Sequence, residues 1–180
     1  MQSTDEQLML ALKQGDRQAL NGLVDRYRDR IVAFAYRMTG CADSAQDMAQ
    51  ETFVRVYKGA RTFQDNGRFS PWLYKIATNV CLSEYARKTK VAVSLDTGGL
   101  EAMQDTGPSV QDTAMNMVDA DRVQCSLSAL NEDHRNVLVM HIFQGLTYVE
   151  IGQALGIPTG TVKSRLFYAI RKLRGLVDLE

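Results

Sequence analysis

The chain has 180 residues, of which 45% are apolar and 8% aromatic, and its 21 basic residues balance 21 acidic ones. This length suits one large or two small domains, and the apolar fraction excludes a wholly disordered chain. No apolar run approaches the roughly 18 residues that a membrane-spanning helix needs, and the acidic start of the chain lacks a signal-peptide core. Three cysteines, 40 and 44 residues apart, form neither a disulfide framework nor a clustered metal site. These features predict a cytoplasmic protein without direct membrane insertion.

The balanced net charge hides an uneven distribution. Residues 89–121 contain one base and six acids, whereas residues 158–176 contain five bases and no acid. A basic stretch on a neutral chain is the local electrostatic pattern of a nucleic-acid contact. A solvated helix face gives the same pattern, so the surrounding motif has to decide between the two.

The first 88 residues carry apolar side chains at spacings of three and four, the period of an amphipathic helix. Asp16 is placed to cap the start of a helix and Gly40 to end it. Further helical patterns cover residues 45–58 and 70–88. Together they predict a helical domain over residues 1–88.

Three acids line one side of the second of these helices. Asp43, Asp47 and Glu51 are four residues apart, which places them on one face. A hard cation needs converging ligands, and no neighbouring loop supplies others. A solvated face and a docking surface for a basic partner both fit this spacing.

Aromatic residues alternate with cations around the start of the third helix. The aromatics are Phe63, Phe69, Trp72, Tyr74 and Tyr85, and the cations are Arg61, Arg68, Lys75, Arg87 and Lys88. Bases stack on rings while phosphates meet cations, so this pattern is typical of a contact with single-stranded nucleic acid. Phe69 and Trp72 also fit the apolar stripe of the helix, and a core role stays open for both.

Residues 89–113 lose the helical period. Two glycines at 98–99, the Gly107-Pro108 pair and scattered acids predict a flexible acidic linker. The helical period returns near residue 114 and continues to 177 through about four helices. No segment alternates as a strand does.

The best-defined motif covers residues 146–173. Thr147 is placed to cap a short helix, and Gly156 follows where a helix-turn-helix needs a positive φ. Because Gly152 has no side chain, this helix can cross close to a second helix, which begins at Thr159. The outward residues of the second helix include no acid: Thr161, Lys163, Ser164, Arg165, Phe167, Tyr168 and Arg171. A DNA recognition helix needs such donors and cations, whereas a purely structural hairpin is expected to mix charge signs. The sequence therefore predicts an all-α protein with two small domains, an N-terminal helical bundle and a C-terminal helix-turn-helix domain over residues 114–180, joined by the flexible acidic linker.

Enzyme chemistry has little support in the sequence. His134 and His141 are the only histidines, and with Cys125 they form a conceivable but ill-spaced metal set. There is no glycine-rich phosphate loop, no nucleophile elbow and no zinc-protease motif.

The ordered set of motifs resembles the extracytoplasmic-function sigma factors, the smallest class of sigma-70 family specificity subunits of bacterial RNA polymerase. Residues 43–53 resemble their polymerase-docking helix, and residues 69–79 resemble their promoter-melting helix. Residues 127–173 look like their C-terminal helix-turn-helix domain, in which residues 160–166 are the most specific run.

This resemblance implies a transcription initiation factor, not an enzyme, that needs no cofactor or metal. It implies binding to core RNA polymerase through the beta-prime clamp coiled coil, recognition of promoter minus-ten and minus-thirty-five elements, and strand opening. It also implies a partner anti-sigma factor and a role in transcription regulation of the stress-response kind. The acidic linker is then expected to thread the basic channels of the polymerase as a nucleic-acid mimic.

The resemblance and the motifs together assign three sets of site residues. The polymerase contact comprises Asp43, Asp47, Gln50, Glu51, Val54 and Arg55. The minus-ten contact and melting surface comprises Phe63, Asn66, Arg68, Phe69, Trp72, Lys75, Asn79, Arg87 and Lys88. The minus-thirty-five contact comprises Thr159, Thr161, Lys163, Ser164, Arg165, Phe167, Arg171 and Lys172.

Three other functions stay open at this point. One is a dimeric transcription regulator with a ligand-sensing N-terminal half, although that half offers no obvious polar pocket lining. Another is a helical enzyme around Cys125, His134 and His141, and the third is a helical protein-interaction module. A metal assay tests the enzyme, and co-purification of core polymerase separates the sigma factor from the interaction module.

Overall fold

The structure, a computed structural model, describes residues 3–64, 68–95 and 114–177, with side chains described for all of these except 88–95, 114–120 and 176–177. The N-terminal elements are α1 (Asp5–Lys13), α2 (Gln18–Thr39), α3 (Ala42–Gly59), the 3-10 turn η1 (Ala60–Thr62) and α4 (Phe69–Leu95). The C-terminal elements are α5 (Ala114–Ser128), α6 (Glu132–Leu138), the π-helix η2 (Val139–Phe143), α7 (Tyr148–Leu155) and α8 (Thr159–Val177). The described ranges contain no strand, which confirms the all-α prediction. No helix within them is long and apolar enough to cross a membrane.

The ends of α2 follow from local chemistry. The carboxylate of Asp16 accepts a hydrogen bond from the N–H of Gln18 at 2.9 Å, and Gln18 is the first residue of the helix. Gly40 ends the helix with a φ of 74°, a left-handed conformation that favours glycine. The prediction that Gly40 ends this helix is confirmed.

The helix-turn-helix is formed by α7, α8 and the turn between them. Thr147 and Glu150 form a capping box at the start of α7, and Gly156 ends this helix with a φ of 67°. At Gly152 a Cβ atom would lie 2.8 Å from the carbonyl oxygen of Ile157. The close approach predicted at this glycine is therefore present, between α7 and the backbone of the turn.

Helix α4 is longer than the sequence predicts. It continues to Leu95, so residues 89–95, assigned above to the linker, are helical. These residues contain no glycine or proline that would stop the helix. The remainder of the predicted linker, residues 96–113, lies outside the described residues.

Each half of the chain encloses apolar side chains. In α1–α4 the fully buried residues include Met9, Leu23, Ile31, Phe34, Phe69, Leu73 and Tyr74. In α5–α8 they include Leu127, Val137, Met140, Ile151, Val162 and Ala169. Burial of such side chains is the main favourable contribution to folding, and here it is divided between two helical domains.

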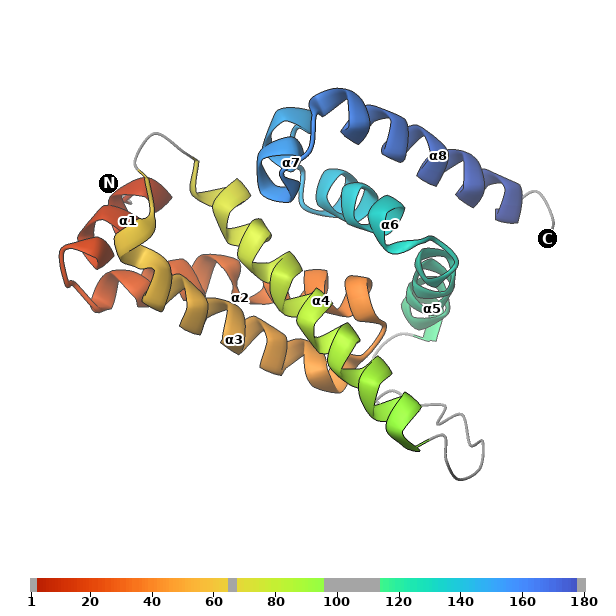
Figure 1. Ribbon diagram of the computed structural model, residues 1–180, viewed down its shortest axis with the longest axis horizontal. Coiled ribbons are helices and arrows are strands. Elements are labelled where there is room, and N and C mark those ends of the chain that lie inside the picture. Colours follow the sequence, from red (N-terminus) through yellow and green to blue (C-terminus); the bar gives the residue numbers. More distant parts are fainter. Residues whose placement is uncertain (1–2, 65–67, 96–113, 178–180) are drawn as a thin grey trace.

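The two halves also pack against each other. Helix α7 lies beside α4 (Figure 1), and both η2 and α6 contact α2. The sequence predicts two domains joined by a linker, but it does not predict how the two domains contact each other. This packing decides which candidate site residues face open solvent.

Candidate polymerase and nucleic-acid interfaces

The candidate polymerase-binding residues lie on one face of α3. Asp43, Asp47, Gln50 and Val54 are exposed, whereas Glu51 and Arg55 are partly buried and form an ion pair at 2.7 Å. The opposite face of α3 is buried through Ala45, Met48, Ala49, Thr52, Phe53 and Val56. The structure therefore places the six predicted residues on an exposed helix face, although Glu51 already has a cationic neighbour.

An apolar groove of about 840 Å³ borders this face, between α2 and α3. Its apolar lining is formed by Leu20, Val24, Val32, Phe53, Val54 and Tyr57, and its polar lining includes Arg17, Arg28, Asp47 and Gln50. Sequence reasoning missed the contribution of α2. The pattern that indicates it is the pair of large side chains Val54 and Tyr57, which are three residues apart and exposed beside the acids.

The aromatic cluster at the start of α4 is mostly core. Phe63 and Phe69 are buried, and Phe69 contacts Tyr27 edge to face at a centroid distance of 5.3 Å. Trp72 is partly exposed and lies edge to face against Phe63 at 5.2 Å. Because a base stacks on an exposed ring, the buried rings of Phe63 and Phe69 offer no stacking surface in this structure, and their contact with DNA stays a prediction. Trp72 keeps part of its ring accessible.

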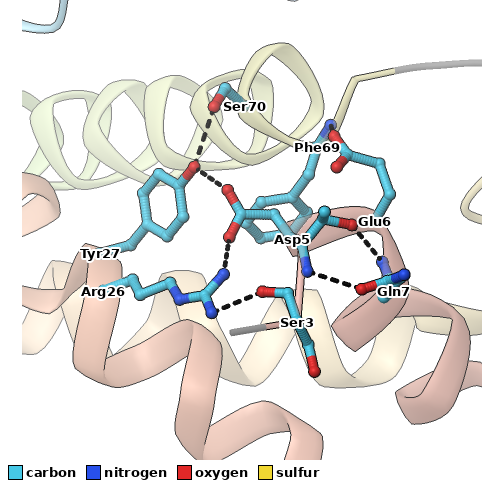
Figure 2. A network of polar contacts seen from close by, with 9 residues as sticks. Ser3, Asp5, Glu6, Gln7, Arg26, Tyr27, Phe69 and Ser70 are labelled. Carbon is cyan, nitrogen blue, oxygen red and sulfur yellow. Dashed lines mark hydrogen bonds and ion pairs between the residues drawn. The ribbon is translucent and has the colours of Figure 1, made fainter. Parts of the chain in front are cut away.

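A polar network pins the start of α4 to α1 and α2 (Figure 2). The hydroxyl of Tyr27 donates to Asp5 at 2.5 Å and lies 3.0 Å from the hydroxyl of Ser70. Arg26 donates to the same Asp5 carboxylate at 2.7 Å. Burial, reinforced by the hydrogen bond to Asp5, raises the pKa of Tyr27 to about 12. Sequence reasoning missed this network because its members are 22 and 43 residues apart and share no local pattern.

Three of the predicted minus-ten residues, two on the exposed side of α4 and one just before it, face the C-terminal half. Lys75 and Asn79 are exposed and line a crevice of about 270 Å³ whose other wall includes Asp133 and Arg165. Arg68, just before α4, pairs with Glu150 of α7 at 2.9 Å.

The remaining minus-ten residues lie elsewhere or are not described. Arg87 lies on a different face of α4 from Lys75 and Asn79. Its guanidinium donates two hydrogen bonds to the carboxylate of Glu84, at 2.7 and 2.9 Å, and these bonds raise the pKa of the guanidinium. Asn66 and the side chain of Lys88 lie outside the described residues.

Helix α8 exposes most of the predicted minus-thirty-five residues. Lys163, Ser164, Phe167, Arg171 and Lys172 are exposed, and Phe167 retains 61% of its surface. Thr159 and Thr161, at the start of the helix, are partly buried. The buried stripe of the same helix consists of Val162, Leu166 and Ala169, as the helical period predicts.

Three of these polar side chains already bond within their own domain. Arg165 is partly buried and donates to the carboxylate of Asp133 in α6 at 2.6 Å. Lys172 donates to the carbonyl of Ala129 at 2.6 Å, and the hydroxyl of Ser164 donates to the carbonyl of Thr161 at 3.0 Å. Any contact that they make with DNA therefore has to replace these bonds or share them.

His134 and His141 do not form a metal site with Cys125. His134 stacks on Tyr168, and the Nδ1 atom of His141 lies 2.9 Å from the carbonyl oxygen of Leu146. In the described part of the chain, no three His, Cys, Asp or Glu side chains come together as metal ligands. Burial raises the pKa of the Cys81 thiol to about 12, which leaves it protonated and unreactive at neutral pH.

Comparisons with known proteins find sigma factors along most of the chain. Residues 23–91 match the family described as Sigma-70 region 2, and residues 126–175 match Sigma-70, region 4. The chain is 36% identical over 171 residues to the ECF RNA polymerase sigma factor SigW of Bacillus subtilis, which covers 91% of each chain. It is 30% identical over 176 residues to the RNA polymerase sigma-H factor of Pseudomonas aeruginosa, which covers 93% of this chain and 91% of the relative.

Solved structures share the fold at lower identity. CnrH in complex with the cytosolic domain of CnrY has a TM-score of 0.78 at 22% identity and covers 99% of both chains. The sigma factor RpoE of Bartonella quintana, in complex with the anti-sigma factor NepR, has a TM-score of 0.72 at 21% identity and covers 89% of this chain and 97% of that one. The fold similarity therefore extends over both halves.

Proposed function

The chain belongs to the extracytoplasmic-function sigma factors of the sigma-70 family, which are transcription initiation factors, and we propose that it directs core RNA polymerase to promoters with minus-ten and minus-thirty-five elements. The observation that carries this proposal is the pair of polar faces on separate domains. An acidic face on α3 borders an apolar groove, and a cationic face covers α8 of the helix-turn-helix. The chain thus offers a protein-docking surface in the part that matches Sigma-70 region 2 and a duplex-reading surface in the part that matches Sigma-70, region 4.

We assign the polymerase contact to the exposed face of α3. Asp43 and Asp47 supply negative charge for a basic partner, while Val54 and the adjoining groove supply apolar surface for its side chains. We take this partner to be the beta-prime clamp coiled coil that the family resemblance implies. Charged residues at such an interface chiefly set specificity and association rate, and the apolar groove supplies affinity.

The promoter contacts are divided between the two domains. The N-terminal domain holds the melted minus-ten strand through Arg68, Trp72, Lys75 and Asn79, which lie along one side of α4 and the loop before it. The C-terminal domain reads the minus-thirty-five duplex through the exposed residues of α8. Two weak contacts on one chain reinforce each other through effective concentration when both sites lie on the same polymerase.

The protein works in the cytoplasm, where the polymerase is, and has no enzymatic activity of its own. Its partners are core RNA polymerase, promoter DNA and an anti-sigma factor. The similar solved structures named above support the last of these: CnrH is bound there to the cytosolic domain of CnrY, and the sigma factor RpoE to the anti-sigma factor NepR. We assign the acidic residues of 96–113 to the polymerase channels on their charge and on the family resemblance.

Transcription in vitro tests this function directly. Purified protein is added to core polymerase and a fragmented genomic library, and the transcript starts are mapped. We expect a set of starts preceded by two shared sequence elements, absent with core polymerase alone. A transcript set identical to that of core polymerase alone would contradict the proposal.

A further inference from the structure

Helix α1 contacts both ends of the chain segment that connects η1 to α4. In the last turn of α1, Nζ of Lys13 donates to the carbonyl oxygen of Phe63 at 3.1 Å. In its first turn, the carboxylate of Glu6 accepts from the backbone N–H of Phe69 at 3.2 Å (Figure 2). Glu6 and Lys13 are seven residues apart, a spacing that places them on one face of the helix. A single helix therefore holds the residues at which this segment begins and ends.

Glu6 supplies a helix cap that the sequence directly before α4 lacks. The first N–H groups of a helix have no partner within it, and a side chain directly before the helix commonly accepts from one of them. The residue directly before α4 is Arg68, whose side chain has donors only. Glu6 accepts instead, from 63 positions earlier, and its negative charge suits the positive end of the helix. The first turn of α4 is thus held by α1.

Tertiary and capping contacts keep α1 itself in place. Met9 and Leu12 are buried, and Thr4 and Gln7 form a capping box at its start. Arg26 of α2 donates to the carboxylate of the first helical residue at 2.7 Å. A short helix gains most of its stability from such contacts, because an isolated helix of this length is marginal in water. Helix α1 is therefore a fixed support for the segment that it contacts.

Both contacts of α1 lead to Trp72. The ring of Phe63 lies edge to face against that of Trp72 at a centroid distance of 5.2 Å, and the ring of Phe69 lies 6.2 Å from it. The two phenylalanine rings are buried and lie 6.4 Å from each other. Close-packed side chains transmit displacements to their neighbours. A shift of either phenylalanine therefore moves the partly exposed ring of Trp72.

We propose that Glu6 and Lys13 are positioning residues for the minus-ten contact and that α1, through them, acts as a brace that fixes Arg68 and Trp72. The side chains of a binding site have to be held within about 0.5 Å of their productive geometry by the residues around them. The brace supplies this support without touching the strand. Its role in promoter reading rests on the proposed function, because it requires that Trp72 contacts the melted strand. The match to Sigma-70 region 2 begins at residue 23 and so includes no part of α1.

Each end of the brace has a disruptive and a conservative substitution. Glu6→Ala removes the acceptor for the N–H of Phe69, whereas Glu6→Gln keeps an oxygen acceptor without the charge. Lys13→Met removes the donor to the carbonyl of Phe63, whereas Lys13→Arg keeps a donor. Asp29→Ala is the control for the loss of an acid, because Asp29 is exposed on α2. Circular dichroism and thermal unfolding check the fold of every variant, and each end of the brace is tested independently of the other.

Fluorescence of Trp72 tests the brace without DNA or polymerase. Trp72 is the only tryptophan of the chain, so the emission reports this position alone. Acrylamide is a neutral quencher, and its effect measures access to the ring irrespective of the charge of each variant. Quenching should increase in Glu6→Ala and Lys13→Met, with emission shifted to longer wavelength, and should stay unchanged in the conservative variants and in Asp29→Ala. Unchanged quenching in both disruptive variants would overturn the brace, whatever the function of the protein.

Transcription with core polymerase tests the role of the brace in promoter reading. Rates are measured on templates with single-base changes in the minus-ten element and, separately, in the minus-thirty-five element. In Glu6→Ala and Lys13→Met, the ratio of rates on unaltered and changed minus-ten elements should fall about fivefold, the lower end of what one stacked base contributes. The same ratio at the minus-thirty-five element should not change, because we assign that element to α8. Glu6→Gln and Lys13→Arg should restore minus-ten discrimination.

The possible outcomes separate the brace from the proposed function. Increased quenching with unchanged minus-ten discrimination would overturn the positioning role. An equal loss of discrimination at both promoter elements would overturn it as well, because a general defect in the protein then explains the result. If the unaltered protein starts no transcripts from these elements, the proposed function and the positioning role both fail. The fluorescence measurement still decides, in that case, whether α1 fixes Trp72.

Discussion

The guanidinium of Arg165 lies 2.6 Å from the carboxylate of Asp133, so a cation of the recognition helix is held by α6 of the same domain. The side chain of Arg165 is 25% exposed and that of Asp133 is 57% exposed. The pair is near the surface, where such bridges contribute little to stability. We expect a larger effect on DNA binding, because the Asp133 carboxylate keeps a negative charge beside the surface that we propose approaches phosphates.

Asp133→Asn should therefore strengthen binding to a minus-thirty-five duplex. The change removes the negative charge and frees Arg165 for a phosphate, so the slope of log affinity against log salt concentration should steepen by about one unit. Fluorescence anisotropy with the full chain at several salt concentrations measures both effects. Asp121→Asn is the matched control, because this exposed acid of α5 lies outside the helix-turn-helix. An unchanged salt slope in Asp133→Asn would show that Arg165 does not reach DNA.

Lys163→Ala and Arg171→Ala should give different phenotypes on α8. Lys163 lies near the start of the helix, and its loss should alter preference at particular positions of the minus-thirty-five element by about 1–3 kcal/mol. Ser164→Ala should act in the same way and also remove the bond to Thr161. Arg171→Ala should weaken binding to all sequences alike. A panel of single-base duplex variants separates these cases, and a uniform loss for Lys163→Ala would contradict its base-reading role.

Charge reversal on α3 should weaken polymerase binding and leave the fold intact. Asp47→Lys places a cation on the exposed acidic face beside the apolar groove. Affinity for core polymerase should fall by about tenfold, chiefly through slower association. Competition with a labelled sigma factor for core polymerase measures this, with circular dichroism as the fold check.

The matched control for that reversal is Asp25→Lys on α2. Asp25 is also exposed, and its replacement changes the net charge by the same amount away from the α3 face. Equal losses of affinity for core polymerase in the two variants would show that the effect comes from net charge alone. If Asp47→Lys still competes fully for core polymerase, the assignment of the polymerase contact to α3 is wrong.

Two glycines of the helix-turn-helix should respond differently to alanine. At Gly152 a Cβ atom would meet the backbone oxygen of Ile157 at 2.8 Å, which forces α7 away from the turn. Gly152→Ala should lower the free energy of unfolding by about 1–3 kcal/mol. Gly160 has nothing within 4 Å of its Cβ position, so Gly160→Ala should be neutral or stabilise the helix by up to about 1 kcal/mol. Thermal unfolding of both variants measures this, and equal effects would contradict the close packing at Gly152.

Two buried tyrosines should make stability fall in alkali. Burial raises the pKa of both Tyr27 and Tyr74 to about 12, above the usual value of 10. A group with a raised folded-state pKa contributes its full stability below the unfolded pKa and loses it as pH rises through the folded value. The free energy of unfolding should therefore be insensitive to these groups below pH 10 and decline between pH 10 and 12. Tyr27→Phe should make this decline shallower. An equally steep decline in the free energy of unfolding of that variant would show that Tyr27 does not contribute to it.

Much of the local structure follows from the sequence. The periods of three and four identify the buried and exposed faces of α2, α3 and α8, because a helix repeats every 3.6 residues whatever it packs against. Gly40 and Gly156 mark helix ends because a left-handed residue there favours glycine. The acidic face of α3 and the cationic face of α8 are visible for the same local reason.

The tertiary structure alone decides which aromatic and charged side chains are available. Phe63 and Phe69 fit both a stacking surface and a core, and only the packing of α1 and α2 against the start of α4 buries them. Arg68 and Arg165 look like DNA-binding cations in sequence, and each is paired with a carboxylate far along the chain. Helix periodicity determines which neighbouring residues share a face, over one or two turns. Contacts between residues that are 32 or 82 positions apart depend instead on how whole helices pack together. The sequence by itself determined the helices and their faces, and the tertiary structure determined which of those faces are covered.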